Sequence, residues 1–155
     1  MGISKKLLAA VTVLALGGVG IGAAWSQDKD KIVNDRQETM KQQGRQLVAV
    51  RNYFQDKGDQ ASATSAIDAL TKSLPKVPDL FPPGTGIGEV SAKTRAKPEI
   101  WKEHDKFLAA DKTVIGQIAQ LDTAVKGGDK AKMEAVFKEI NFCSGCHDTF
   151  RAKEQ

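Results

Sequence analysis

The stretch KMEAVFKEINFCSGCHDTFRAK, residues 132–153, sets the fold expected for the whole chain. Its apolar side chains recur every three or four residues and lead directly into two cysteines and a histidine: Met133, Val136, Phe137, Ile140, Cys143 and His147. This spacing predicts an amphipathic helix over about 130–153, because residues three and four apart share a helix face. One stripe therefore joins a hydrophobic face to a group of reactive side chains.

Three more helices are expected upstream, over about 29–57, 60–74 and 98–127. Gly58-Asp59 and Gly127-Gly128-Asp129 each combine a helix stop with a capping residue for the next helix. Residues 75–97 hold four prolines and three glycines, which predicts a long irregular connection, with Leu80 and Phe81 reaching the core. Two short turns and one crossover predict an all-α fold, an antiparallel four-helix bundle.

Residues 1–26 are expected to be an export signal. Lys5 and Lys6 precede an apolar run, a glycine-rich stretch follows, and Ala24-Trp25-Ser26 offers small residues to a signal peptidase. We place the cut before Gln27, which leaves one domain over 27–155 that works in the periplasm. The alternative is an uncleaved membrane anchor, because residues 7–24 form 18 residues without a charge.

The composition excludes several classes of protein. A chain of 155 residues with 41% hydrophobic and 27% charged residues is ordinary for one globular domain. A formal charge of +4 is too small to indicate a nucleic-acid partner, and two cysteines cannot build a disulfide-rich scaffold.

The segment Cys143-Ser144-Gly145-Cys146-His147 has the C-x-x-C-H spacing that attaches c-type haem. Two thiols on one helix face reach the two vinyl groups of one porphyrin, and the adjacent imidazole reaches the iron. A disulfide beside an unrelated histidine is one alternative. A thiol redox motif is another, although that motif needs a strand leading into it. We predict one covalently attached haem c, held by Cys143 and Cys146, with His147 as the proximal iron ligand.

Three segments resemble the class II cytochromes c: residues 143–151, Pro83-Gly84-Thr85-Gly86 and Lys97-Pro98-Glu99-Ile100-Trp101. This family comprises the cytochromes c-prime and their low-spin, methionine-ligated relatives. The resemblance covers essentially the whole of residues 27–155, and it implies an exported four-helix bundle with the haem attached near the C-terminus. The position of the motif at the end of the chain is its discriminating feature, because most c-type cytochromes carry the motif near the N-terminus.

Three side chains are candidates for the sixth position on iron: Met40, Met133 and His104. Met133 lies 14 residues before His147 on the same predicted helix, about 21 Å away at about 1.5 Å per residue, and is excluded. His104 stands among charged residues, which predicts a solvated position. Met40 lies on the apolar face of the first helix, where the alternative role is a space-filling core methionine.

The resemblance favours Met40 as the distal ligand, because Arg36 four residues before it and Gly44 four after it match the first helix of the low-spin members. Other members place a bulky residue at this point without coordination. The resemblance also implies that Arg151 lies beside the proximal histidine. Arg36 is a candidate partner for a haem propionate, and solvation explains its position equally well.

The leading functional hypothesis is therefore a periplasmic electron carrier with low-spin haem bound by His147 and Met40, which docks transiently on redox proteins of a respiratory or photosynthetic chain. The alternative is a five-coordinate, high-spin cytochrome c-prime that binds nitric oxide or carbon monoxide. A third hypothesis is a haem-free dithiol protein. We expect no enzyme, because nothing pairs a nucleophile with a general base. We expect a monomer rather than a homodimer, and no stable membrane insertion after cleavage.

Overall fold

The computed structural model describes residues 21–139 and 144–153, so residues 1–20 of the predicted signal, which spans 1–26, lie outside this part. The described residues form helices joined by turns and loops, without a strand among them. The helices are α1 (Ile21–Phe54), α2 (Gln60–Ser73), α3 (Glu99–Lys102), α4 (His104–Lys126), α5 (Lys130–Glu139) and α6 (Ser144–Phe150), with two short 3₁₀ helices, η1 (Leu74–Lys76) and η2 (Pro78–Leu80).

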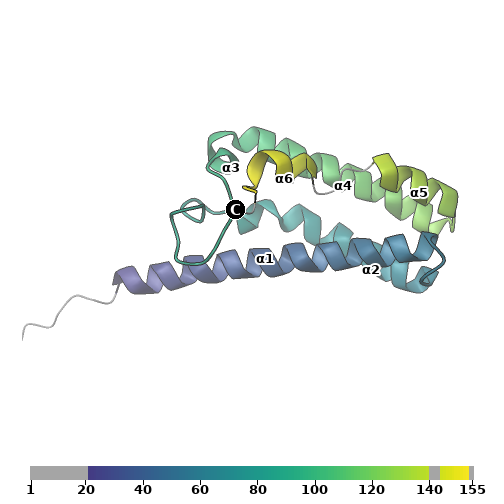
Figure 1. Ribbon diagram of the computed structural model, residues 1–155, viewed down its shortest axis with the longest axis horizontal. Helices are drawn as coiled ribbons and strands as arrows, with labels where there is room; N and C mark the ends of the chain where they lie inside the picture. Colours follow the sequence, from purple (N-terminus) through teal and green to yellow (C-terminus); the bar gives the residue numbers. More distant parts are fainter. Residues whose placement is uncertain (1–20, 140–143, 154–155) are drawn as a thin grey trace, which may run out of the picture.

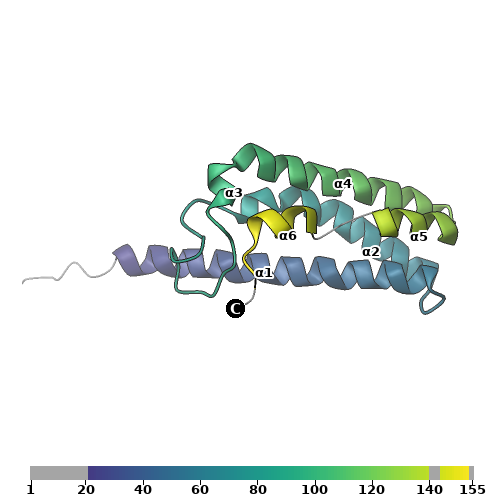
Figure 2. The ribbon, with the colours of Figure 1, turned by 45° about the horizontal axis from the view of Figure 1, so that its top comes forward.

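The helices form an elongated four-helix bundle, in which two of the four arms each consist of two consecutive helices. This arrangement confirms the predicted architecture. Helix α1 packs along α2, α4 packs against α2 and α5, and α5 returns to α1 (Figure 1). The third arm consists of α3 and α4, and the fourth of α5 and α6. Helix α6 packs against α3 and α4, at the end of the bundle where the connection between α2 and α3 crosses α1 (Figure 2). The C-terminal segment and this connection therefore lie together.

Helix α1 differs from the prediction at both ends. It begins at Ile21, upstream of the expected start near Lys29, and it ends at Phe54 rather than at Lys57. The C-terminal end is closed by Asp56, which adopts a left-handed φ of 59°. The amide of Lys57 bonds Asn52 O at 2.8 Å, and the amide of Asp56 bonds Tyr53 O at 3.1 Å. This Schellman arrangement places the left-handed residue two positions before the glycine that predicted the stop.

The predicted cap of the second helix is confirmed. The Asp59 carboxylate accepts a hydrogen bond of 2.8 Å from the amide of Ser62. Helix α2 ends at Ser73, and the chain continues through η1 and η2. The prediction of an irregular connection over 75–97 is therefore wrong for residues 75–80 and confirmed for residues 81–97, where no helix or strand is assigned. Pro75 and Pro78 lie in the first turns of η1 and η2, where the missing N–H is not needed.

The third and fourth predicted helices are each shorter than expected. The third is divided at Glu103, whose φ of −119° and ψ of 46° are not helical. The fourth does not reach Lys153, because α6 ends at Phe150 and Arg151 forms an isolated antiparallel bridge with Ala96. Residues 140–143, between α5 and α6, lie outside the described part.

The core consists mainly of aliphatic residues from α1, α2, α4 and α5, with a cluster of aromatic rings at the α6 end. Phe81 and Phe107 meet edge to face at 5.1 Å, and Phe107 and Phe150 meet at 5.4 Å. Phe81 packs against the core as expected, while Leu80 is half-buried. No helix in the described ranges combines the length and apolar character needed to cross a bilayer.

Candidate functional site

Helix α6 carries two of the three residues of the predicted haem motif. Cys146 and His147 are half-buried, and Cys146 packs against the hydrophobic core. Cys143, the other predicted attachment residue, lies outside the described residues. The apolar face of the last arm therefore continues into a thiol and an imidazole, as the sequence pattern indicates.

The electrostatic surroundings of His147 favour its neutral form. Burial lowers the pKa of His147 below its ordinary value, and the positive charge of Arg95 lowers it further, against an opposing effect of Asp148. Arg151 lies one turn later, with its Nη1 atom 3.4 Å from His147 Nδ1. The structure thus brings Arg151 beside His147, whose role as the proximal ligand stays a prediction. Arg95 was missed, because it reaches α6 from the connection, far away in the sequence.

These residues fit a c-type haem. A neutral imidazole is the form that binds iron, and within the described residues His147 Nε2 makes no hydrogen bond that would compete for it. The Cys146 thiol, on the same helix, would supply one attachment point. The predicted contact of Arg151 with the haem stays a prediction.

The three candidates for the sixth iron ligand occupy different environments. Met40 is partly buried on α1 and packs against the core. Met133 is fully buried on α5, and His104 is exposed on α4. The exposed position of His104 and the apolar surroundings of Met133 agree with the sequence pattern. Iron coordination by Met40 stays a prediction.

Arg36 is buried, with 4% of its surface exposed, so solvation does not explain its position. Its guanidinium bonds the connection between α2 and α3 and stacks on Phe81 at 4.3 Å from the ring centroid. Burial lowers the pKa of Arg36 to about 10. The contact of Arg36 with a haem propionate stays a prediction.

Two buried polar residues were missed. Thr85 is fully buried in the connection and bonds Arg36. It lies in the segment 83–86, whose resemblance to the class II cytochromes c could have drawn attention to it. Asp111 is 7% exposed on α4, and burial raises its pKa to about 6. Its carboxylate makes no hydrogen bond with any described residue. The signal was its position on the apolar stripe between Phe107 and Val114.

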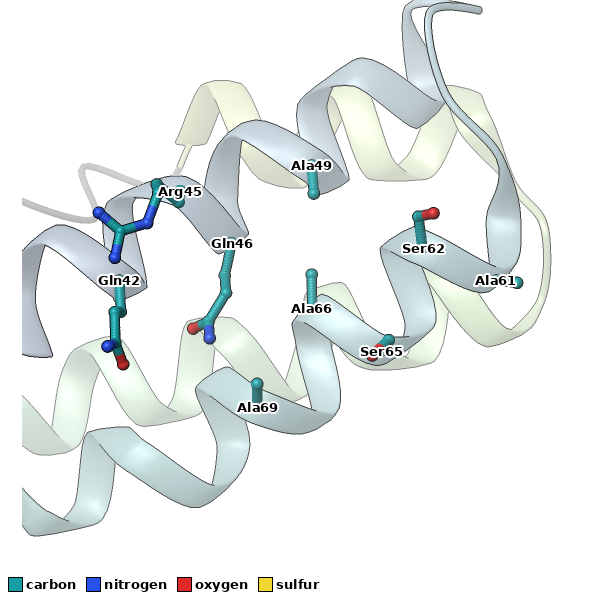
Figure 3. Close-up of a pocket in the computed structure, with 9 residues that line it drawn as sticks. All are labelled: Gln42, Arg45, Gln46, Ala49, Ala61, Ser62, Ser65, Ala66 and Ala69. Carbon is teal, nitrogen blue, oxygen red and sulfur yellow. The ribbon is translucent and has the colours of Figure 1, made fainter.

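A hollow lies between α1 and α2 (Figure 3). It measures about 750 Å³. Its α2 side is lined by small residues, among them Ala66 and Ala69, and its α1 side by Gln42, Arg45, Gln46 and Ala49. It contains none of the predicted site residues.

A helical bundle whose last helix presents the cysteine and histidine of a C-x-x-C-H motif at its core belongs to the class of c-type haem proteins. Residues 31–151 match the cytochrome C' family, and the chain belongs to this family. One covalently attached haem c is therefore its cofactor.

Individual relatives agree with this assignment. Cytochrome c' of Cereibacter sphaeroides is 36% identical over 93 residues, which are 60% of this chain and 62% of the relative, so the match spans less than two thirds of that protein. The crystal structure of cytochrome c' from Rubrivivax gelatinosus is 28% identical, with a TM-score of 0.69 over 80% of this chain and 97% of that one. A nitric oxide complex of a mutant cytochrome c prime from Alcaligenes xylosoxidans, 24% identical, shares the fold, with a TM-score of 0.69 over 81% of this chain and 97% of that one.

Proposed function

We propose that this protein binds a small neutral gas, nitric oxide or carbon monoxide, at the iron position opposite His147. The observation that carries the proposal is membership of the cytochrome C' family over residues 31–151. The haem supplies an iron that changes between ferric and ferrous states and can take a gas at an open position. The leading expectation from the sequence, a low-spin electron carrier, is less well supported than this alternative.

The character of the α1 face supports a neutral ligand. The core side of α1 carries Val33, Met40, Leu47 and Val50, which are buried or partly buried. The two buried polar residues on the helix, Arg36 and Gln43, are engaged elsewhere. Arg36 bonds the connection, and Gln43 Nε2 donates to Ser73 Oγ at 3.2 Å. A charged ligand would therefore give up its hydration on this face without gaining hydrogen bonds from Arg36 or Gln43. A neutral diatomic molecule is weakly hydrated and gives up little hydration free energy.

In this proposal the residues of the chain have distinct roles. His147 holds the iron from the α6 side, Cys143 and Cys146 hold the haem covalently, and Met40 packs over the sixth position without coordination. Arg151, whose guanidinium lies beside His147 Nδ1, places a positive charge next to the imidazole.

The second candidate is electron transfer with Met40 as the distal ligand. The position of Met40, partly buried and one turn from Arg36 on α1, favours it. In that case the iron would have no open position, and the protein would serve redox partners of a respiratory or photosynthetic chain. In both cases the protein works in the periplasm, outside a membrane, and is not an enzyme.

Absorption spectroscopy of the purified protein separates the two functions. We expect a high-spin ferric spectrum, stoichiometric uptake of carbon monoxide by the ferrous form, and no change of spin state in Met40→Leu. Met133→Leu, which alters the fully buried methionine of α5, is the matched control. A low-spin spectrum that becomes high-spin only in Met40→Leu would overturn gas binding and establish the electron carrier.

A further inference from the structure

Arg36 fastens α1 to the connection that crosses it. Its Nη1 atom donates to Leu80 O at 3.4 Å and to Thr85 Oγ1 at 3.3 Å. Its Nη2 atom donates to Thr85 O at 3.0 Å and to Thr94 Oγ1 at 2.8 Å. The plane of the guanidinium also faces the ring of Phe81. One side chain of α1 thus holds three separate points of the connection.

These bonds are unusual because no carboxylate of the described residues pairs with Arg36. The buried charge is stabilised by carbonyl and hydroxyl dipoles, and the Thr85 hydroxyl donates onward to Pro82 O at 2.8 Å. Moving the connection away would leave a buried cation without acceptors, which is strongly unfavourable. The position of the connection on α1 is therefore tightly determined.

The same connection is joined to α6 by backbone hydrogen bonds. The amide of Lys97 bonds Phe150 O at 3.0 Å, and the amide of Ala152 bonds Arg95 O at 2.9 Å. The Thr94 hydroxyl that receives Arg36 also accepts from the amide of Ala96, at 3.2 Å. These contacts form one hydrogen-bonded route from α1 to the helix of His147.

Aromatic packing gives a second route between the same two helices. Arg36 stacks on Phe81, Phe81 contacts Phe107, and Phe107 contacts Phe150 at the end of α6. Met40 lies four residues after Arg36, one turn further along α1. Arg36 consequently ties the turn of α1 next to Met40 to the helix of His147 by two independent sets of contacts.

We propose that Arg36 is a positioning residue that fixes Met40 relative to His147 and so limits the access of a gas to the iron. This inference rests on the proposed function, because it takes the haem to lie between these two side chains. The haem contact of Arg36 predicted from the sequence is not part of it.

The test uses Arg36→Lys, which keeps the charge and loses the planar fork of donors. Thr94→Val, which removes one acceptor from a half-buried position, is the second variant in case the first does not mature. Gln60→Ala is the matched control, because it removes a comparable bond, Gln60 Nε2 to Val125 O at 2.9 Å, at the opposite end of the bundle.

Two quantities are measured on the haem-loaded protein: the rate of carbon monoxide binding to the ferrous form, and hydrogen exchange of the Lys97 and Ala152 amides in the ferric form. We expect both to rise about fivefold in Arg36→Lys and Thr94→Val, as the loss of one hydrogen bond implies, and to stay unchanged in Gln60→Ala. Equal gas-binding rates in all variants, with uptake by the wild type intact, would overturn the positioning role alone. No uptake by the wild type would overturn both this role and the proposed function.

Discussion

Replacing Asp111 by asparagine should stabilise the protein at neutral pH. Asp111 is 7% exposed and lies on the apolar stripe of α4, and its carboxylate has no hydrogen-bond partner among the described residues. Its pKa is raised by burial from 3.8 to about 6. The folded protein therefore binds the proton more tightly than the unfolded chain does, so the stability from this group is complete below pH 3.8 and is lost as the pH rises through about 6.

The magnitude follows from the difference in pKa. At about 1.4 kcal/mol per pKa unit, a carboxylate with these two values would cost at most about 3 kcal/mol when fully ionised. Solvent screening at a side chain that keeps some exposure reduces this, and we expect about 1–2 kcal/mol. Asparagine has nearly the same shape and does not ionise in this range.

Urea unfolding, followed by circular dichroism between pH 5 and pH 7.5, measures the effect on the ferric protein. We expect Asp111→Asn to exceed the wild type in free energy of unfolding by about 1–2 kcal/mol at pH 7.5, and this gap to narrow by about half at pH 5. Asp105→Asn, at an exposed site on the same helix, controls for the removal of one negative charge. A gap that does not change with pH, or a variant less stable than the wild type at pH 7.5, would refute the reasoning.

Two further predictions concern the helix cap and the N-terminus. Asp59→Ala removes the carboxylate that accepts from the Ser62 amide and should lower the urea midpoint in the same assay; an unchanged midpoint would show that the cap contributes nothing. N-terminal sequencing of the exported protein should begin at Gln27, as the small residues before it predict. A chain that keeps residues 1–26 and fractionates with membranes would instead support the uncleaved anchor.

Local sequence signals predicted the features that depend on neighbouring residues. The Gly58-Asp59 pair gave the cap of α2, because the capping bond joins residues three apart. Helix α1 ends earlier than predicted because Asp56, which is not a glycine, adopts the left-handed conformation that the prediction assigned to Gly58. The end of α6 was missed because it depends on Ala96, a partner far away in the chain.

The candidate site divides in the same way. Cys146 and His147 could be proposed as haem residues from the sequence because the spacing of the motif is itself the chemical requirement. The buried position of Arg36 was not predictable, because its acceptors, Thr85 and Thr94, belong to a connection whose path no local pattern determines. Asp111 was overlooked because one acidic residue does not remove the periodicity of a helix that is otherwise apolar on that face.

The central claim is that this chain carries one haem fixed through thioether bonds at the C-x-x-C-H segment of its last arm. Mass spectrometry of the intact exported protein, with peptide mapping of residues 143–147, tests it most directly. We predict a mass greater than that of the polypeptide by one haem, carried by the peptide that contains both cysteines. A mass equal to that of the polypeptide, with the cysteines as thiols or joined in a disulfide, would contradict the claim.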